Sequence, residues 1–257
     1  MMNNYKSNLL SFTFFLFLIF SSQSTQSAPY ELTVYSDDLP SRGEAELEIL
    51  SSLAKVNTDD FGVRSNVIQN LIEYNFGLSN EISVGIEFPN SIYQNHSKLQ
   101  GLKAEIQYVP EHEKILGWYY GIRADYGFES SVYENTGAHG FDINPIIGLR
   151  LYSWHFVFNP SIEKQLDGES KKTTFKPSAK ILYGVSGETK IGLEFYGALG
   201  AIGSFAPRSQ REENLYAVIE KKFSELKINF GFGKPLHLYE ATADSWIAKM
   251  GLSFDID

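Results

Sequence analysis

Cysteine is absent from this chain of 257 residues, and basic residues are in the minority. Without cysteine the protein has no disulfides, which excludes the small disulfide-stapled scaffolds. Lys and Arg number 22 against 31 Asp and Glu, so the formal net charge is -9. Because nucleic-acid binding calls for a basic patch, we expect no nucleic acid among the partners.

Long apolar runs are missing everywhere except near the N-terminus. Residues 9–20 are apolar apart from two hydroxyl residues, follow Lys6 and precede a small polar stretch. This layout is typical of a secretory signal peptide, so we predict a leader at 1–27 with cleavage after Ser27. No later stretch has the roughly 20 apolar residues that a membrane helix needs. A mature chain that enters a membrane must therefore do so as strands.

Glycine recurs in a five-residue pattern of apolar, Gly, apolar, variable, apolar. Successive strand side chains point to opposite faces, so each copy places three apolar groups on one face and Gly on the other. Five copies favour the crowded inside of a closed barrel, where Gly makes room for long neighbouring side chains. The copies are 84–88, 120–124, 147–151, 191–195 and 250–254.

Alternating apolar and polar residues continue from 44 to the C-terminus and indicate about twelve strands. The predicted connections between these strands alternate between short and long without exception, as they do in up-and-down barrels of the outer membrane. We therefore predict an all-β fold, a transmembrane antiparallel up-and-down β-barrel at 44–257. The polar stretch 28–43 has no clear period and is expected to be a periplasmic N-terminal segment.

Aromatic residues make up 14% of the chain, and their positions support a membrane barrel. Trp118, Trp154 and Trp246 all lie at predicted strand starts on the apolar face. Aromatic girdles at the two water interfaces of a barrel have this placement, whereas core aromatics of a soluble domain would fall in mid-strand as often.

Two stretches resemble Gram-negative outer-membrane barrels that are loosely grouped with phenol meta-pathway transporter-like proteins. They are 35–48 (YSDDLPSRGEAELE) and 74–82 (YNFGLSNEI). The resemblance implies an outer-membrane location, outer-membrane lipid and the barrel assembly machinery as partners, and passage of a small-molecule solute. It carries over no catalytic residue. Such barrels usually end on an aromatic residue, whereas this chain continues for three residues beyond Phe254.

The predicted inward face carries charges of both signs, which pair in a narrow lumen because an unpaired buried charge is costly. Two functions remain open: the charge networks leave a thin polar path for solutes, or they fill the barrel and make it a structural anchor whose loops bind a partner. The candidates for lining the lumen are Glu73, Glu87, Lys103, Glu105, Arg123, Asp125, Asp142, Arg150, His155, Glu163, Lys176, Lys180, Glu194, Glu220, Lys227 and Lys249.

Signatures of catalysis and of cofactor or metal binding are missing. No His-Glu-x-x-His, paired-Cys or phosphate-loop spacing occurs, so we expect no cofactor, no metal and no enzymatic activity. An outer-membrane lipid-modifying enzyme needs a Ser and a His held together, and a cross-strand pair of this kind is not visible in a sequence. Of the five histidines, His155 falls within a strand and is expected to face the lumen.

Three prolines fall inside three successive predicted strands, all on the outward face: Pro145, Pro160 and Pro177. Each removes a donor from the sheet's hydrogen-bond ladder. The plainer interpretation is three independent bulges or rim positions. The functional interpretation is a weak lateral seam through which an apolar solute leaves the lumen for the bilayer.

Overall fold

The computed structural model describes residues 33–58, 63–93, 96–130, 137–167, 173–207, 211–237 and 246–256, so the expected signal peptide lies outside the described residues. No helix in these ranges is long and apolar enough to cross a membrane. The strands are β1 (Ala45–Thr58), β2 (Val63–Gly77), β3 (Ile82–Tyr93), β4 (His96–Leu99), β5 (Gly101–Tyr108), β6 (Leu116–Ser130), β7 (Gly137–Leu151), β8 (Trp154–Gln165), β9 (Thr173–Gly184), β10 (Thr189–Ala198), β11 (Gly200–Ala201), β12 (Ser204–Phe205), β13 (Glu212–Phe223), β14 (Leu226–His237) and β15 (Ile247–Ile256).

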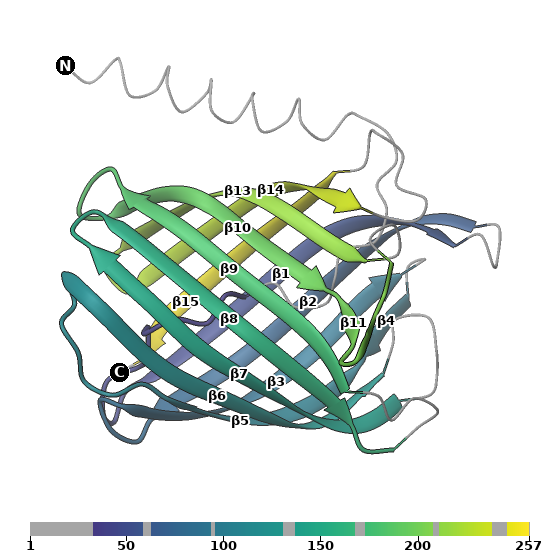
Figure 1. Ribbon diagram of the computed structural model, residues 1–257, viewed down its shortest axis with the longest axis horizontal. Coiled ribbons are helices and arrows are strands. Elements are labelled where there is room, and N and C mark those ends of the chain that lie inside the picture. Colours follow the sequence, from purple (N-terminus) through teal and green to yellow (C-terminus); the bar gives the residue numbers. More distant parts are fainter. Residues whose placement is uncertain are drawn as a thin grey trace, which may run out of the picture.

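Twelve of these strands form one closed antiparallel barrel (Figure 1). Each pairs with its neighbours in the chain, and β1 pairs with β15 from Ala45 opposite Ile256 to Leu53 opposite Ala248, which closes the sheet. The short strands β4, β11 and β12 extend the sheet at one end. The predicted fold and strand number are confirmed.

The two ends of the barrel differ in their connections. We call the end with 78–81, 109–115, 152–153, 185–188 and 224–225 the turn end, and the opposite end the loop end. The predicted alternation of short and long connections has two exceptions. Segment 109–115 at the turn end is long, because it folds back to contact the lumen, while β1 and β2 extend so far that only 59–62 remains between them at the loop end.

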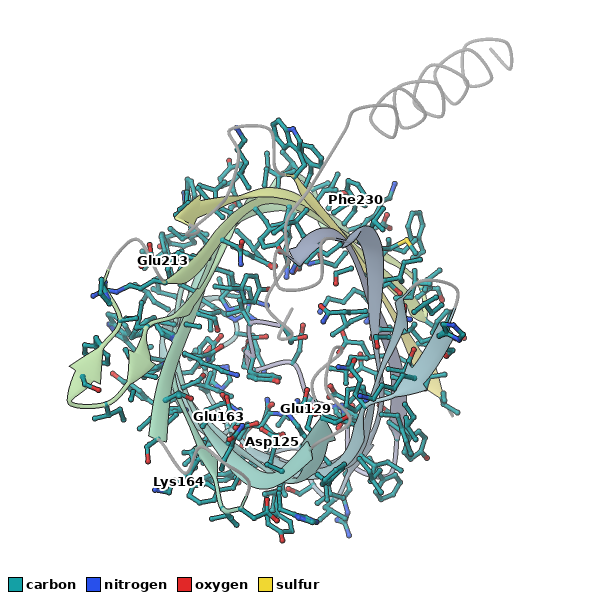
Figure 2. All side chains as sticks on the ribbon, turned by 90° about the vertical axis from the view of Figure 1, so that its right-hand side faces the viewer. Asp125, Glu129, Glu163, Lys164, Glu213 and Phe230 are labelled. Atoms are coloured by element: carbon teal, nitrogen blue, oxygen red, sulfur yellow. The ribbon has the colours of Figure 1, made fainter. Side chains whose placement is uncertain are left out.

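Large apolar side chains cover the outside of the barrel. Ile122 is 45% exposed and Trp118 60% exposed, and Phe230 points outward in the view along the barrel (Figure 2). Trp118 and Trp154 lie near the turn end and Trp246 at the loop end, so the tryptophans border the apolar band on both sides. A barrel in a bilayer presents this surface.

Glycines of the recurring pattern do make room on the inward face. Gly148 pairs with Tyr119 across β6 and β7, and the Tyr119 ring occupies the space that a β-carbon at Gly148 would need. At Gly192 the obstructing atom is the backbone oxygen of Ile181 on the neighbouring strand. The glycines of the pattern therefore stand where a side chain would collide with its surroundings, which are neighbouring side chains at some copies and neighbouring backbone at others.

Candidate functional site

The stretch before β1 lies inside the barrel. Val34, Tyr35, Ser36 and Asp37 are at most 6% exposed, and they contact inward-facing residues of several strands. The sequence led us to expect a periplasmic segment at 28–43, but residues 33–37 occupy the lumen instead. Residues 28–32 lie outside the described part of the chain. We call 33–40 the lumen segment.

Amide side chains from the wall hold the backbone of the lumen segment. Asn159 on β8 donates its Nδ2 hydrogen to the carbonyl oxygen of Tyr35 at 3.0 Å. Gln107 on β5 donates from Nε2 to the carbonyl oxygen of Ser36 at 2.8 Å. A buried carbonyl without a partner costs free energy, so these amides let an irregular backbone lie inside the barrel.

Asp37 fastens the lumen segment at the turn end. Its carboxylate, with no exposed side-chain surface, accepts hydrogen bonds from Nε and Nη2 of Arg150 at 3.1 and 2.6 Å. His112 approaches the same carboxylate with Nε2 at 2.7 Å, and Lys114 with Nζ at 3.4 Å. His155 lies 3.7 Å away. We call this set the Asp37 latch.

The latch changes the acidity of Asp37. Burial acts to raise the pKa of its carboxyl, but the hydrogen bonds and charge of Arg150, with the hydrogen bond of His112, outweigh burial and hold the pKa well below its usual range. Asp37 therefore stays ionised at any pH near neutrality. A bidentate Arg–carboxylate pair also fixes orientation, which makes the latch a specific attachment rather than a loose charge contact.

Arg123 on β6 meets the lumen segment farther along the barrel. Its guanidinium carbon lies 4.0 Å from the centre of the Tyr35 ring. The same guanidinium donates to Glu73 at 3.1 Å and to Asp125 at 2.9 Å, and it also contacts Glu87 and Glu105. We call this contact between Tyr35 and Arg123 inside the lumen the constriction.

Cavities lie on both sides of this constriction. A cavity of about 250 Å³ toward the loop end is lined by residues that include Gln100, Glu129 and Tyr35. Toward the turn end a cavity of about 100 Å³ is lined by residues that include Tyr35 and Leu39, and it shares Leu39 with a third cavity of about 270 Å³ at the turn-end mouth. The first two share Tyr35, so this side chain separates the two parts of the lumen.

One part of the inner wall is apolar, which the expected polar lumen did not anticipate. Ile146, Val157 and Leu182 are at most 3% exposed and belong to a buried cluster that includes Val34 of the lumen segment. The adjacent part of the wall, on β2 to β6, carries the charged residues around Arg123. The inner wall therefore changes from charged to apolar around its circumference.

No protein-family model and no curated protein matches the sequence. Among solved structures, the COG4313 outer membrane channel from Pseudomonas putida F1 is similar with a TM-score of 0.58 and 10% identity, over 91% of this chain and 100% of that chain. LpxR from Salmonella typhimurium has a TM-score of 0.45 and 9% identity, over 81% and 99%. Outer membrane phospholipase A from Escherichia coli has 0.42 and 9%, over 90% and 95%.

At such identities the likeness to the channel shows the fold alone. The fold is an outer-membrane type of β-barrel, which agrees with the barrel of the first comparison. No sequence match supports the finer grouping with phenol meta-pathway transporter-like proteins.

All the predicted lumen residues lie on the inward face. Those that are buried are Glu73, Glu87, Glu105, Arg123, Asp125, His155, Lys180, Glu194, Glu220 and Lys249, and those that are half-buried are Lys103, Asp142, Arg150, Glu163, Lys176 and Lys227. Whether they line a conducting path stays a prediction. Sequence reasoning did not find Tyr35 and Asp37, because an Asp-Asp-Leu-Pro stretch is also an ordinary turn composition.

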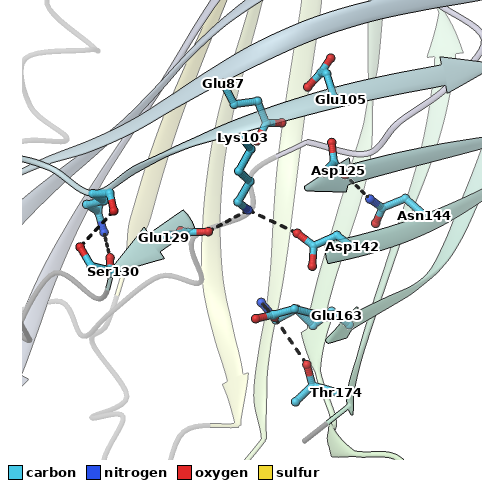
Figure 3. Close-up of polar contacts among 12 residues, drawn as sticks. Glu87, Lys103, Glu105, Asp125, Glu129, Ser130, Asp142, Asn144, Glu163 and Thr174 are labelled. Carbon is cyan, nitrogen blue, oxygen red and sulfur yellow. Dashed lines mark hydrogen bonds and ion pairs between the residues drawn. The ribbon is translucent and has the colours of Figure 1, made fainter. Parts of the chain in front are cut away.

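The inward charges pair across strands toward the loop end (Figure 3). Lys103 reaches Glu129 at 2.7 Å and Asp142 at 3.3 Å, while Asn144 donates to Asp125 at 2.9 Å. Asp142 lies directly opposite Asp125, and like charges in this position destabilise a sheet. The contact of Lys103 with Asp142 offsets part of that cost.

The three prolines lie side by side at one height. Pro160 is opposite Pro177 in an unbroken β8–β9 register, whereas β7–β8 pairing stops at Ile143 opposite Ile162 and resumes at Ile147 opposite Phe158. Pro145 and Pro160 lie in this interruption, and Asn159 spans it by donating to the carbonyl oxygen of Pro145 at 3.2 Å. The predicted seam is therefore an interruption of β7–β8, and at Pro177 the β9–β10 pairing ends as well, with Tyr196 opposite Ser178. Its functional role stays untested.

Proposed function

We propose that this protein is a narrow outer-membrane channel for small solutes, in which the lumen segment forms a built-in constriction. The observation that carries the proposal is the arrangement of two cavities separated by Tyr35 and Arg123. In a barrel that serves only as a structural anchor, side chains would be expected to fill the lumen on both sides of the lumen segment, rather than leave cavities there. Outer-membrane lipid and the assembly machinery are the partners expected for such a barrel.

The exposed apolar band supports the membrane setting of the proposal. Monomeric soluble proteins rarely expose contiguous apolar patches of more than a few hundred Å². The described residues place an apolar side chain outward at alternate positions of every long strand, for example Ile86, Leu102, Ile122 and Leu193. The outer membrane is the compartment in which closed barrels of this kind satisfy every backbone group.

A catalytic role is not part of the proposal. Among the described residues, the hydrogen bonds of His112, His139 and His155 go to aspartate, tyrosine and a backbone carbonyl, and none goes to a serine. Nucleophilic catalysis by serine depends on such a contact.

A lateral route for apolar solutes is the second candidate function. The interruption between β7 and β8 lies beside Ile146 and Val157, which line the apolar part of the lumen. An apolar solute that reaches this wall from the loop-end cavity would meet the place where the ladder lacks backbone hydrogen bonds.

Conductance in a planar bilayer tests the proposal. The wild-type protein should give small single-channel currents, well below those of wide porins, and deletion of 33–40 should raise them severalfold. Glu44→Gln is the matched control, because Glu44 follows the lumen segment with an exposed side chain and should leave the current unchanged. If neither the wild type nor the deletion variant carries current, the channel proposal is overturned. This result would favour a structural barrel whose loops bind a partner.

A further inference from the structure

Carboxylates outnumber cations around Arg123. The guanidinium contacts Glu73, Glu87, Glu105 and Asp125. Lys103 lies directly opposite Glu87, but it contacts two further carboxylates, Glu129 and Asp142, and so brings no surplus of positive charge. Four carboxylates against one guanidinium leave three excess negative charges in a buried place, where uncompensated charge is most costly.

Strand register creates this excess. Glu73 lies directly opposite Glu87 on β3, and Glu105 lies directly opposite Asp125 on β6. Like charges in directly opposite positions repel, so the sheet would be more stable with the charge neutralised. The single positive charge of Arg123 cannot neutralise the four negative charges of these two pairs.

Oxygen atoms without donors converge beside the guanidinium. Arg123 engages Oε1 of Glu73, while Oε2 of this 2% exposed residue is buried without a hydrogen-bond partner. Oδ1 of the 8% exposed Asn75 is buried and unpartnered as well. Exchanging the oxygen and nitrogen of the Asn75 amide would not remove the unpartnered acceptor. The nitrogen already donates to Glu73 Oε1, and the exchange would place an oxygen against that carboxylate.

Gly85 leaves the space into which Oδ1 of Asn75 points. Oδ1 of Asn75 and Oε1 of Glu105 both lie where a β-carbon at Gly85 would collide with them, the Glu105 oxygen at 2.8 Å from that position. Two acceptors thus face each other over a missing side chain. One oxygen each from Glu73, Glu87 and Glu105 lie within 4.8 Å of one another, a spacing that a single ion can bridge.

We propose that Glu73, Glu87 and Glu105, with Oδ1 of Asn75, bind a divalent calcium ion beside Arg123. Ca²⁺ takes oxygen ligands at about 2.3–2.6 Å, so ligands on opposite sides of it stand nearly 5 Å apart, and it accepts irregular geometry. The donor set contains only oxygen, which suits a hard cation rather than zinc or copper. The ion lowers the excess from three negative charges to one.

The site adjoins the constriction, which gives the ion a structural role there. Arg123 stacks on Tyr35, so an ion that shares the carboxylates with Arg123 sets the position of the guanidinium against the lumen segment. The inference does not depend on conduction, since a non-conducting barrel would bind the ion equally. No short sequence motif marks this site, because the ligands come from three different strands, β2, β3 and β5.

Terbium and calcium binding to the detergent-solubilised, EDTA-treated mature protein test the proposal. Tyr35 beside the site should sensitise terbium emission, Ca²⁺ should displace the terbium, and Ca²⁺ should raise the thermal unfolding midpoint. Glu73→Gln should weaken Ca²⁺ binding by tenfold or more, as loss of a ligand charge does. Glu163→Gln, another lumen carboxylate whose partner is Lys176, is the matched control and should bind like the wild type.

A second variant keeps the test decisive if Glu73→Gln fails to fold. Asn75→Asp adds a charged ligand at the same place and should tighten Ca²⁺ binding. Equal Ca²⁺ responses of the wild type and of the variants at Glu73 and Asn75 would overturn the site. The absence of any Ca²⁺ response in the wild type would also overturn it, and would assign the excess charge to bound protons instead.

Discussion

Gly148 lies directly opposite Tyr119, and the tyrosine ring fills the space that any larger residue at Gly148 would need. Tyr119 is 2% exposed, shares a 2.7 Å hydrogen bond with His155 Nε2 and stacks on His112 at 4.7 Å between ring centres. One missing side chain on β7 thus positions an aromatic ring that in turn supports the Asp37 latch.

Replacing Gly148 with Ala should displace this ring. The added methyl group overpacks the wall, and overpacking costs about 1 to 3 kcal/mol of unfolding free energy. Urea unfolding of the barrel in lipid vesicles measures the change. Gly187→Ala is the control, since a β-carbon there meets nothing within 4 Å. A Gly148→Ala variant as stable as the control would contradict the packing argument.

Asp37→Asn should loosen the lumen segment. The neutral amide cannot satisfy Arg150 as a carboxylate does, and a hydrogen bond to a charged group contributes about 1.5 to 3 kcal/mol. We expect more frequent channel opening in the planar bilayer and faster cleavage of the lumen segment by added protease. Asp167→Asn changes an exposed loop carboxylate and should affect neither measurement. Unchanged gating in Asp37→Asn would show that the latch does not hold the segment.

The latch should also respond to acid in a defined window. Arg150, His112, Lys114 and His155 face Asp37, and the pKa of this carboxyl lies below its usual range in the folded protein. A group with a lowered pKa stabilises the fold above its unfolded pKa of about 3.9 and loses this contribution as pH falls further. Opening should thus be flat from pH 7 to about pH 5 and rise only below about pH 4. Opening of the wild type at pH 6 that persists in Asp37→Asn would assign the response to another group.

A charged side chain on the outward apolar band should lower the unfolding free energy strongly at mid-height of the barrel and only slightly at its end. Ile122→Arg places a cation where a bilayer midplane is expected, at about 2 to 4 kcal/mol. Ile115→Arg, at an exposed position of the turn-end segment 109–115, should cost at most about 1 kcal/mol. Refolding yield and urea unfolding in vesicles compare the two. Equal tolerance of both would argue against a membrane-spanning barrel.

Restoring donors at the seam should strengthen β7–β8. Pro145→Val with Pro160→Val returns two N–H groups at the interruption, and a net hydrogen bond is worth about 0.5 to 1.5 kcal/mol. The melting temperature should rise, and uptake of an apolar solute should fall while polar solutes pass as before. Pro177→Val is the control for transport, because Pro177 lies outside the β7–β8 interruption and its replacement should leave uptake of the apolar solute unchanged. Increased stability without a transport defect would make the interruption an ordinary bulge.

The sequence allowed the barrel, its strand number and its inward residues to be predicted because alternation is a local property. Each strand repeats it, so the Glu87 and Arg123 side chains could be assigned to one face. The lumen segment could not be found in this way. Its partners are 71, 113 and 124 residues away in the chain, and backbone carbonyls that accept the bonds leave no trace in the sequence. The carboxylate cluster was hidden for the same reason, since it depends on strand register.

The lumen segment has a consequence for how the sheet is completed. Its anchors, Gln107, Arg150 and Asn159, belong to the middle of the chain, while the strand that follows it must join the last one. Docked residues 35–37 therefore tether the start of β1 at a fixed height. A slip of one residue would turn every side chain of β1 to the wrong face. The docked segment thus helps to fix the register in which the first strand, β1, pairs with the last strand, β15.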